Sequence, residues 1–519
     1  MTAKTLMIMG THSNAGKSIL VTALCRIFAQ EGYRVAPFKA QNMALNAGVT
    51  LEGQEIGRAT IAQAEAAGLP PHVDMNPILL KPEGNRRSQV VLNGRHYTHI
   101  DANNWLSLKS LLWPHVTAAL DRLRAKTDLV IIEGAGSPAE INLKEGDIVN
   151  MRVARHAQAP VLLVGDIDQG GVFAALVGTM VLLEPEERAL VKAFIINKFR
   201  GDVALLGNGL RLLQERAFNT PTLGVIPFLP DIGIAAEDSV ALDGVMRRGG
   251  EAVRSEGAGE QGSGGEKALS LDIVVIRLPC ISNFDDFDPL AAEPGVQVRF
   301  IERLADLGQP VAIILPGSKM TLADLAWLRQ TGLAEQIVRL AKAGTPVVGI
   351  CGGYQMLGQS LLDPQGVEAA PGTHAPGLGL LAIETIFAGD KRTVQVQATL
   401  QAKIGPFAAL HDTPIHGYEI HMGRSQPISS TTPALCQVGH SLERHADGAL
   451  TAAGRIWGTY LHGLFDNDAL RHAWLRSLGW QGNGRLFNRQ LAYNRLAEHV
   501  RAHLDMTTLQ RIVWRHIVE

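Results

Sequence analysis

The chain has 519 residues, of which 46% are hydrophobic and 19% charged, and its formal net charge is −2. This length exceeds a single hydrophobic core, so about two or three domains of ordinary globular composition are expected. The near-neutral charge provides no basic field for nucleic acid, and no apolar run is long enough to span a bilayer. Four scattered cysteines indicate a reducing compartment, the cytoplasm, rather than a disulfide framework.

The first strand-like run, TLMIM, leads into GTHSNAGKS (10–18) and then into an apolar helical pattern. This order predicts a strand, a phosphate-binding loop and a helix whose positive end faces the anion. Gly16 would permit the tight turn, Lys17 would neutralise phosphate oxygens of ATP, and Ser18 would bind Mg²⁺. The spacing G-x5-G-K-S is one residue longer than the usual P-loop. The expected ATP-binding residues are Thr11, Ser13, Asn14, Gly16, Lys17, Ser18 and, from a later strand, Asn197.

Two polar stretches follow, FKAQNMALN and MNPILLKPEG, each beside a strand-like run. Their cationic and amide side chains suit a substrate that carries several carboxylates and amides. The solvated polarity of an ordinary loop is the alternative. The candidate substrate-binding residues are Lys39, Gln41, Asn42, Asn76 and Lys81.

Later strand-like runs of the first half also end in polar residues. LVIIEGAGS places Glu133 at a strand end, where its carboxylate could hold Mg²⁺ directly or through water. A glutamate that only ends the strand is the alternative. FIINKFRGD places Asn197 where its amide could bind a purine edge. The predicted magnesium site therefore consists of Ser18 and Glu133.

The segment 248–267 is rich in Gly, Glu and Ser and nearly lacks apolar side chains, which predicts a flexible linker. It separates a first domain, 1–247, from a second, 268–480, and a helical appendage is expected over 481–519. Both domains alternate continuous Val/Ile/Leu runs with helical patterns, which is typical of parallel strands buried on both faces. We therefore expect two doubly wound α/β domains with ligands beyond the carboxyl ends of the strands.

In the second domain, PVVGICGGYQMLG places Cys351 at a sharp turn between a strand and a helix. Glycines on both sides allow the crowded backbone of a nucleophile elbow, with sulfur as the nucleophile. A cysteine nucleophile needs a base, and His462 in GTYLHGLF follows a short strand in a glycine-bounded turn. The other candidates are His416 and His421, for which metal binding is disfavoured because no third ligand is evident.

Together, ILPGSK, GICGGYQMLG and GTYLHGLF resemble class I, triad-type glutamine amidotransferases. The resemblance implies that Cys351 and His462 release ammonia from glutamine. Leu464 stands two residues after His462, where most such enzymes carry a Glu, so the group that orients His462 is left open; this departure is itself a feature of the cobalamin-type subgroup. The implied oxyanion and glutamine contacts are Gly317, Gly352, Gly353 and Tyr354.

The loop 10–18 lacks the extra lysine of partition-type ATPases and resembles the loop of dethiobiotin synthetase, which activates a carboxylate with ATP. Over residues 10 to about 463, stretches such as FKAQNMALNAGVT, VGDIDQGGVFA, ISNFDDFDPL and IHGYEIHMGR resemble the cobyric acid synthase family, the cobalamin-type (CobB/CobQ) glutamine amidotransferases. The implied fold is α/β: a P-loop, dethiobiotin synthetase-like, doubly wound parallel-sheet domain followed by a class I amidotransferase domain.

The same resemblance implies the reaction. ATP and Mg²⁺ would support amidation of the b, d, e and g carboxylates of adenosylcobyrinic acid a,c-diamide, through acyl phosphates and ammonia released from glutamine. The product would be adenosylcobyric acid, in cobalamin biosynthesis. No nucleic acid or membrane partner is expected.

Three other functions are less consistent with these residues. Cobyrinic acid a,c-diamide synthase performs the same chemistry on an earlier intermediate, and the FKAQNM stretch argues against it. A dethiobiotin-type ligase with an inert second domain is disfavoured by the intact Cys351 and His462. A P-loop regulatory ATPase would turn over ATP without glutamine. The sequence leaves open the order of the amidations, the ammonia route, the corrin contacts and the oligomeric state.

Overall fold

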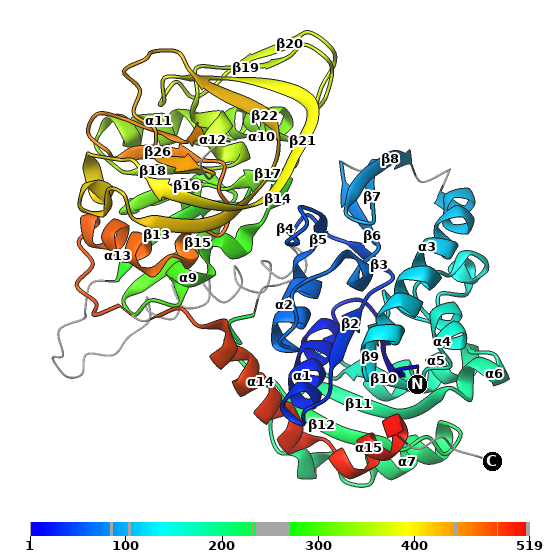
Figure 1. Cartoon of the computed structure of the whole chain (residues 1–519). Coiled ribbons are helices and arrows are strands. Elements are labelled where there is room, and N and C mark those ends of the chain that lie inside the picture. The colour runs from blue at the N-terminus through cyan, green and yellow to red at the C-terminus, as the bar shows by residue number, and fades with distance from the viewer. Residues whose placement is uncertain are drawn as a thin grey trace, which may run out of the picture. The chain divides into compact units, whose positions relative to one another are not determined.

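The computed structural model describes residues 2–83, 87–101, 105–230, 232–234, 270–439, 444–484 and 486–514. The predicted linker at 248–267 lies outside these residues. The chain forms two compact units (Figure 1). Unit 1 comprises Met1–Ala44, Glu55–Ala235 and Asn488–Glu519, and unit 2 comprises Leu45–Gln54 and Ala236–Phe487. Segment 45–54 therefore belongs to unit 2, although it lies within the N-terminal half of the chain, and the C-terminal segment from Asn488 belongs to unit 1. The two units are not consecutive stretches of sequence.

Unit 1 is built on a six-stranded parallel sheet of order β12-β11-β10-β1-β9-β2. Successive side chains of β1 point to opposite faces, so Leu6 and Ile8 join one apolar cluster while Met7 and Met9 join another. The continuous apolar runs of the sequence thus reflect burial on both faces. The strands are β1 (Lys4–Gly10), β2 (Val35–Phe38), β9 (Leu129–Glu133), β10 (Val161–Asp166), β11 (Val191–Phe199) and β12 (Thr222–Pro227).

Helices cover both faces of this sheet (Figure 1). On the Leu6 face lie α1 (Lys17–Gln30), α14 (Arg489–His503) and α15 (Met506–Trp514). On the Met7 face lie α3 (Trp105–Lys126), α4 (Met151–Ala157) and α5 (Val172–Leu182). The expected doubly wound fold is confirmed. Further helices of the unit are α2 (Arg58–Ala66), α6 (Pro185–Arg188) and α7 (Gly209–Arg216). Among the described helices, none combines the length and apolarity that crossing a bilayer demands.

A smaller four-stranded sheet of order β3-β6-β7-β8 is also part of unit 1. Its strands are β3 (Gln41–Met43), β6 (Ile78–Pro82), β7 (Arg87–Leu92) and β8 (Arg95–Asp101). In the register, Asn42 pairs with Leu79 and Lys81 pairs with Gln89. Since residues two apart in a strand share a face, Asn42, Lys81 and Gln89 lie on the same face of this sheet. A short strand, β5 (Glu55–Gly57), precedes α2.

Unit 2 contains a six-stranded sheet of order β15-β13-β16-β18-β26-β25, parallel except at β25. Its strands are β13 (Leu271–Ile276), β15 (Val296–Ile301), β16 (Ala312–Leu315), β18 (Val347–Ile350), β25 (Ala449–Leu450) and β26 (Ile456–Thr459). The sequence predicted these strands except the two-residue β25. The helices among the described residues of this unit are α9 (Asp288–Ala291), α10 (Thr321–Gln330), α11 (Leu333–Lys342), α12 (Gly352–Leu357) and α13 (Asp468–Ser477).

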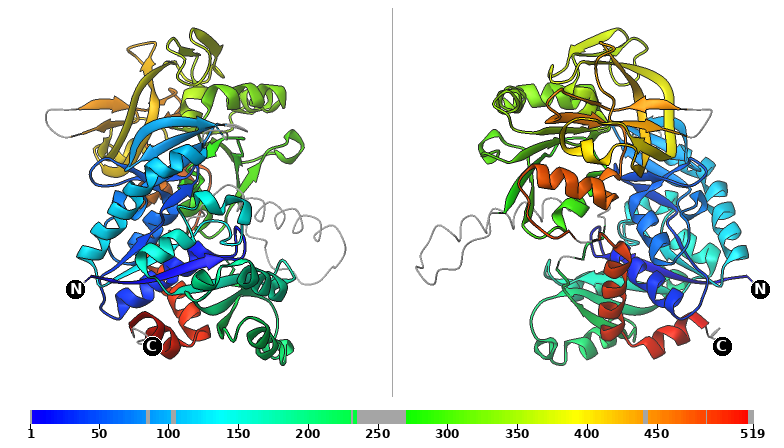
Figure 2. Two further views of the ribbon diagram at one scale, coloured as in Figure 1. Left: turned by 90° about the vertical axis from the view of Figure 1, so that its right-hand side faces the viewer. Right: turned by 60° about the vertical axis from the view of Figure 1, so that its left-hand side comes forward.

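A second sheet of unit 2 is mostly antiparallel and has the order β20-β19-β21-β23-β24, with β22 paired to β21. Figure 2 shows β21 and β22 as a long curved pair in yellow and orange. Inward side chains such as Val396 and Ala398 join the same apolar cluster as the parallel sheet. The strands are β19 (Ser360–Asp363), β20 (Thr373–Pro376), β21 (Ile383–Leu400), β22 (Pro414–Pro427), β23 (Cys436–Val438) and β24 (His445–Asp447).

Candidate active site

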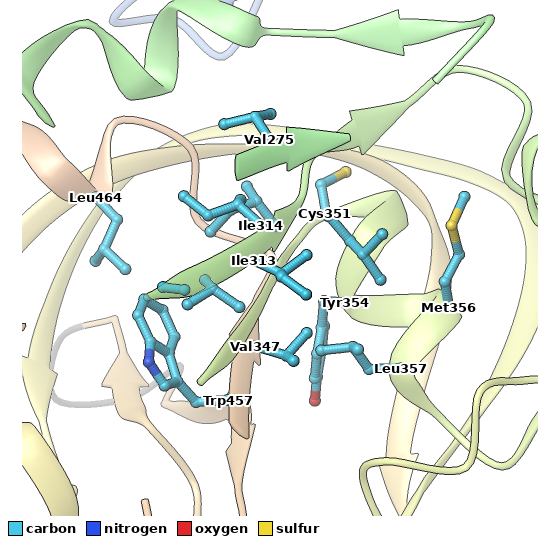
Figure 3. Packing of buried hydrophobic residues seen from close by; sticks show 14 of the residues in the cluster. Val275, Ile313, Ile314, Val347, Cys351, Tyr354, Met356, Leu357, Trp457 and Leu464 are labelled. Atoms are coloured by element: carbon cyan, nitrogen blue, oxygen red, sulfur yellow. The ribbon is translucent and has the colours of Figure 1, made fainter. Parts of the chain in front are cut away.

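Cys351 occupies the turn between β18 and α12. Figure 3 shows it among the buried side chains of the apolar cluster of unit 2. Its φ of +52° is strained for a residue with a Cβ. The flanking glycines are required by close packing. A Cβ at Gly353 would lie 2.0 Å from Leu315 O, and one at Gly352 would lie 2.9 Å from Ser318 N. The turn therefore has the geometry expected of a nucleophile elbow.

His462 lies on the turn after β26 and is 1% exposed. Its Nδ1 lies 2.7 Å from Oδ2 of Asp286, whose other carboxylate oxygen accepts a hydrogen bond from the Gly463 N–H at 2.8 Å. Because a carboxylate accepts, Nδ1 carries the proton, and Nε2 is left for the thiol of Cys351, with which the ring interacts. The structure thus assembles a Cys–His–Asp arrangement.

The sequence pattern assigns no role to Asp286, although the stretch ISNFDDFDPL contains it. The residue lies in the short 3₁₀ helix η5 (Phe284–Phe287), 176 residues before His462, so no local spacing connects the two. Its only signal was the presence of three acidic residues, Asp285, Asp286 and Asp288, in one short stretch. Leu464, where related enzymes carry a Glu, is 1% exposed and belongs to the apolar core (Figure 3).

The titration of this pair follows from burial and charge. Burial lowers the pKa of His462, but the negative charges of Asp286 and Cys351 and the hydrogen bonds to both outweigh it, and together they raise the pKa to about 10. Burial raises the pKa of Asp286, and the attraction of His462 lowers it only in part. Two N–H donors converge on the Asp286 carboxyl group, so its ionised form and the imidazolium support each other.

The short strand β17 (Gly317–Ser318) brings a second backbone segment to the triad, paired with β14 (Ile281–Ser282). A Cβ at Gly317 would lie 3.0 Å from Cε1 of His462, so only glycine fits without displacement. Gly317 lies beside His462 and Gly352 directly follows Cys351, which is the placement that an oxyanion site at these residues would require.

Gly353 and Tyr354 are placed differently. The Gly353 N–H donates to Pro316 O at 3.0 Å. Tyr354 is 3% exposed, meets Tyr460 edge-on at 5.3 Å between ring centroids, and belongs to the core labelled in Figure 3. Burial raises the pKa of its hydroxyl well above the ordinary value. Both residues shape the elbow, and their contact with glutamine stays a prediction.

The two other candidate histidines are engaged elsewhere or exposed. His416 is exposed on β22. His421 Nδ1 donates to Gly423 O at 2.7 Å, and its ring stacks on Tyr460 at 3.8 Å between centroids. Burial lowers the pKa of His421 to about 4, so the ring is neutral. Within the described residues, no group of three or more His, Cys, Asp or Glu side chains could hold a metal ion.

In unit 1, α1 begins at Lys17, directly after Gly16 with a φ of +100°. A side chain at Gly16 would be strained and would place a Cβ 2.1 Å from Asn197 Nδ2. Lys17 Nζ donates to His12 O at 3.0 Å and to Gly136 O at 3.3 Å, so the ammonium group lies over the loop. The loop and its lysine thus have the arrangement of a phosphate site at a helix N-terminus.

Ser18 and Glu133, the predicted magnesium ligands, lie together. Ser18 Oγ donates to Glu133 Oε1 at 2.7 Å, and Lys39 Nζ lies 2.8 Å from the same oxygen. Gln63 Nε2 donates to the other carboxylate oxygen at 2.6 Å, and Glu133 is 1% exposed. A hydroxyl and a carboxylate beside a phosphate loop are oxygen ligands of the kind that Mg²⁺ prefers, so this donor set fits the ion.

Asn197 contacts the loop backbone, since its Nδ2 donates to Ala15 O at 3.0 Å. The next residue, Lys198, donates to Asn14 O at 2.7 Å and lies 2.8 Å from Asp166 Oδ2. These bonds stabilise the left-handed turn at Asn14, whose φ is +63°. Two further predicted ATP-binding residues lie in the same loop, Thr11 half-buried and Ser13 exposed.

The candidate substrate residues differ in their partners. Lys81 Nζ lies 2.6 Å from Glu55 Oε1, and Asn76 Nδ2 donates to two backbone carbonyls at 3.0 and 2.9 Å. In the described part of the chain, the buried atoms Gln41 Oε1 and Asn42 Nδ2 have no hydrogen-bond partner. Such atoms are costly and rare in native structures, so these amides indicate a place for a polar ligand.

A phosphate-loop unit and a Cys–His–Asp unit in one chain are the parts of a glutamine-dependent ligase. Comparison with family models agrees with both parts. Residues 6–241 match the CobQ/CobB/MinD/ParA nucleotide binding domain, and residues 272–470 match the CobB/CobQ-like glutamine amidotransferase domain.

Proteins named cobyric acid synthase from Chloroflexus aggregans and Roseiflexus castenholzii are each 51% identical to this chain, over 99% and 97% of both sequences respectively. One from Dehalococcoides mccartyi is 49% identical and covers 98% of this chain and 99% of its own. The chain belongs to the cobyric acid synthase family. The resemblance drawn from the motifs and the expectation of a glutamine-dependent ligase are confirmed.

Proposed function

We propose that the chain amidates the b, d, e and g carboxylates of adenosylcobyrinic acid a,c-diamide, using ATP and glutamine, to give adenosylcobyric acid. The observation that carries the proposal is the Cys351–His462–Asp286 arrangement in the same chain as the Ser18–Glu133 pair. The name of the relatives supports the corrinoid as the acceptor. The cysteines are free, in keeping with a cytoplasmic enzyme.

The glutaminase half-reaction follows from the geometry of unit 2. The thiol proton of Cys351 resides on His462, and the sulfur attacks the carboxamide carbon of glutamine. The Gly352 N–H and the backbone at Gly317 bind the oxyanion. The imidazolium, held by Asp286, gives its proton to the leaving nitrogen, the C–N bond breaks, and ammonia departs. Water, deprotonated by the now neutral His462, then hydrolyses the thioester to glutamate and frees the sulfur, and the proton remains on His462.

The ligase half-reaction uses the groups of unit 1. A corrinoid carboxylate oxygen attacks the γ-phosphorus of ATP, and the bond to the ADP oxygen breaks to leave an acyl phosphate. Lys17 and the loop N–H groups neutralise phosphate charge. Ser18 and Glu133 would hold Mg²⁺, which supplies positive charge to the β- and γ-phosphates. Ammonia attacks the acyl carbon and loses a proton, and inorganic phosphate leaves.

Polar groups of unit 1 support binding of a corrinoid. Its carboxylates and amides present both acceptors and donors, which suits a site lined by cations and amide groups. Gln89 Oε1, buried on the same sheet face as Asn42, also lacks a hydrogen-bond partner among the described residues. Asn76 supports the neighbouring backbone. We assign to the substrate site Lys39, Gln41, Asn42 and Lys81, with Asn76 as the residue that positions them.

The test is mass spectrometry of the corrinoid after incubation of purified protein with Mg-ATP, glutamine and adenosylcobyrinic acid a,c-diamide. Stepwise conversion of four carboxylates to amides is expected. A Cys351→Ala variant should amidate with ammonium and not with glutamine, because only the ammonia source is lost. As a matched control, Cys436→Ala changes another buried thiol of the same unit, on β23, and should retain both activities.

Two results would overturn the proposal. If cobyrinic acid is amidated at a and c instead, the chain is the earlier diamide synthase. If no corrinoid is amidated by protein that hydrolyses both ATP and glutamine, the acceptor is a different acid.

A further inference from the structure

A segment from the N-terminal part of the chain, Leu45–Gln54, belongs to unit 2. It contains the short strand β4 (Ala47–Val49) and is largely buried. Gln395 on β21 donates to Val49 O and so secures the segment at the second sheet. Asn46, at the start of the segment, is fully buried at 0% exposure.

The segment binds the turn that carries the triad carboxylate. Ala47 N donates to Asn283 Oδ1 at 3.3 Å, and Asn283 Nδ2 donates back to Ala47 O at 2.8 Å. Asn46 Oδ1 accepts from the Phe284 N–H at 3.4 Å. Asn283 and Phe284 begin η5, and the Asp286 N–H donates to Asn283 O at 3.1 Å. The position of Asp286 is therefore set by a turn that the segment holds on two sides.

Asn283 is also connected to His462 through Tyr418. Asn283 Nδ2 donates to the Tyr418 hydroxyl at 3.1 Å, and the Tyr418 ring stacks on His462 at 5.4 Å between centroids with 24° between the planes. The backbones of Tyr418 and His462 exchange two hydrogen bonds, at 3.1 and 2.9 Å. Asn283 thus contacts Tyr418, which stacks on the His462 ring, and also caps the turn that carries Asp286.

We propose that Asn46 and Asn283 are positioning residues of the glutaminase site, so that the segment 45–54 completes the Asp286–His462 pair. This inference rests on the proposed role of Cys351 and His462. A general base must hold its geometry closely, and a displacement of about 1 Å costs roughly a hundredfold in rate. Asn283 has a φ of +53°, a conformation that asparagine and glycine tolerate, so its side chain can be removed as Asn283→Gly without adding backbone strain.

The experiment compares Asn46→Ala and Asn283→Gly with wild type in the full chain. Both variants should lower the glutaminase kcat about ten- to hundredfold with little change in the KM for glutamine. Amidation driven by ammonium should be unchanged. Asn46→Asp keeps the acceptor for the Phe284 N–H and should recover most of the lost kcat. Asn488→Ala, which removes the N-cap of α14 in unit 1, is the control for a general loss of stability and should leave kcat unchanged.

A second readout reports on the thiol and imidazole without any substrate. The rate of Cys351 alkylation by iodoacetamide, followed against pH, should shift in both variants toward the profile of Asp286→Asn. An unchanged kcat and alkylation profile in folded Asn46→Ala and Asn283→Gly would overturn the inference. So would a parallel fall of ammonium-driven amidation, since that result indicates a general structural role. Failure of corrinoid amidation by wild type would instead refute the proposed function, and the alkylation profile would still test the segment.

Discussion

Oδ2 of Asp286 lies 2.7 Å from Nδ1 of His462, across 176 residues of sequence. The other carboxylate oxygen is bonded to the Gly463 N–H at 2.8 Å, so the carboxylate fixes both the ring and the turn that carries it. Nδ1 donates, and Nε2 remains for the thiol. This relationship answers what orients His462 when Leu464 occupies the position of the usual Glu.

Replacing Asp286 by Asn should impair the glutaminase and spare the ligase. The amide cannot stabilise an imidazolium and favours the wrong tautomer, which in a Ser–His–Asp enzyme costs about ten-thousandfold in kcat. We expect a loss of about a hundredfold or more in glutamate release, with ammonium-driven amidation retained. Asp285→Asn, a change at the adjacent carboxylate, is the matched control. Full glutaminase activity in Asp286→Asn would refute the assignment.

The pH dependence of glutaminase activity and of stability should also change in Asp286→Asn. The pKa of His462 is raised from 6.5 to about 10, so its protonation stabilises the fold fully below pH 6.5, and this contribution is lost as pH rises toward about 10. In Asp286→Asn the main raising charge is gone, and burial lowers the pKa. The alkaline limb of kcat/KM for glutamine should therefore move to lower pH, and the free energy of unfolding should fall less between pH 6.5 and 10 than in wild type. A limb that stays in place would contradict this reasoning.

The phosphate loop can be tested with two glycines of similar conformation. Gly16 and Gly32 have φ values of +100° and +92°, but an added Cβ meets Asn197 at 2.1 Å in the first and nothing within 4 Å in the second. Both Gly→Ala changes should cost about 1–2 kcal/mol of stability from backbone strain. Only Gly16→Ala should raise the KM for ATP, by about tenfold or more, measured in ammonium-driven amidation. Equal KM values would exclude the loop from ATP binding.

Glu133→Gln should weaken the Mg²⁺ binding assigned to this carboxylate. The amide loses the charge that Lys39 and Ser18 now contact, and it is a poorer ligand for a hard cation. We expect ammonium-driven amidation to fall about a hundredfold or more and its Mg²⁺ requirement to rise, while glutamine hydrolysis continues. Asp128→Asn alters the exposed pair with Arg34 just before the same strand and serves as the control. A variant with normal Mg²⁺ dependence would remove Glu133 from the site.

Arg471 should be one of the most sensitive structural positions. Its side chain is 0% exposed, lies 2.8 Å from Glu293, and donates to Phe465 O at 2.8 Å, which anchors the turn after His462. Arg471→Ala leaves Glu293 buried without this partner and should lower the free energy of unfolding by about 3–5 kcal/mol. Urea denaturation measures it. Arg34→Met, at an exposed ion pair, should change stability by about 1 kcal/mol or less, and equal effects of the two changes would be incompatible with burial as the cause.

The sequence allowed prediction of those features that depend on local patterns. The strand, glycine turn and helix around Lys17 and around Cys351 are contiguous, so apolar runs and glycine spacing were sufficient. The inner strands of both parallel sheets were evident because they are buried on both faces. The small β3-β6-β7-β8 sheet and the long β21–β22 pair were not foreseen, because their half-buried strands have mixed patterns.

The features that could not be predicted depend on contacts distant in sequence. Asp286 is one of several acidic residues of its stretch, and only the fold shows which one reaches His462. The orphaned amides of Gln41 and Asn42 likewise become visible only when burial and hydrogen bonds are known. Segment 45–54 lies in sequence between the candidate substrate residues at 39–42 and those at 76–81, so composition gave no reason to assign it to the other unit.

The exchange of segments between the units has a consequence for modularity. If the gene were cut at the predicted linker, the C-terminal fragment would lack β4, the strand next to the turn that carries Asp286. The same fragment would carry α14 and α15, whose apolar faces pack in the core of unit 1. Neither half is therefore a complete domain that could be fused to another protein and keep its structure. In a recombinant of two related enzymes, activity would be retained only if segment 45–54 came from the same parent as unit 2 and segment 488–519 from the same parent as unit 1.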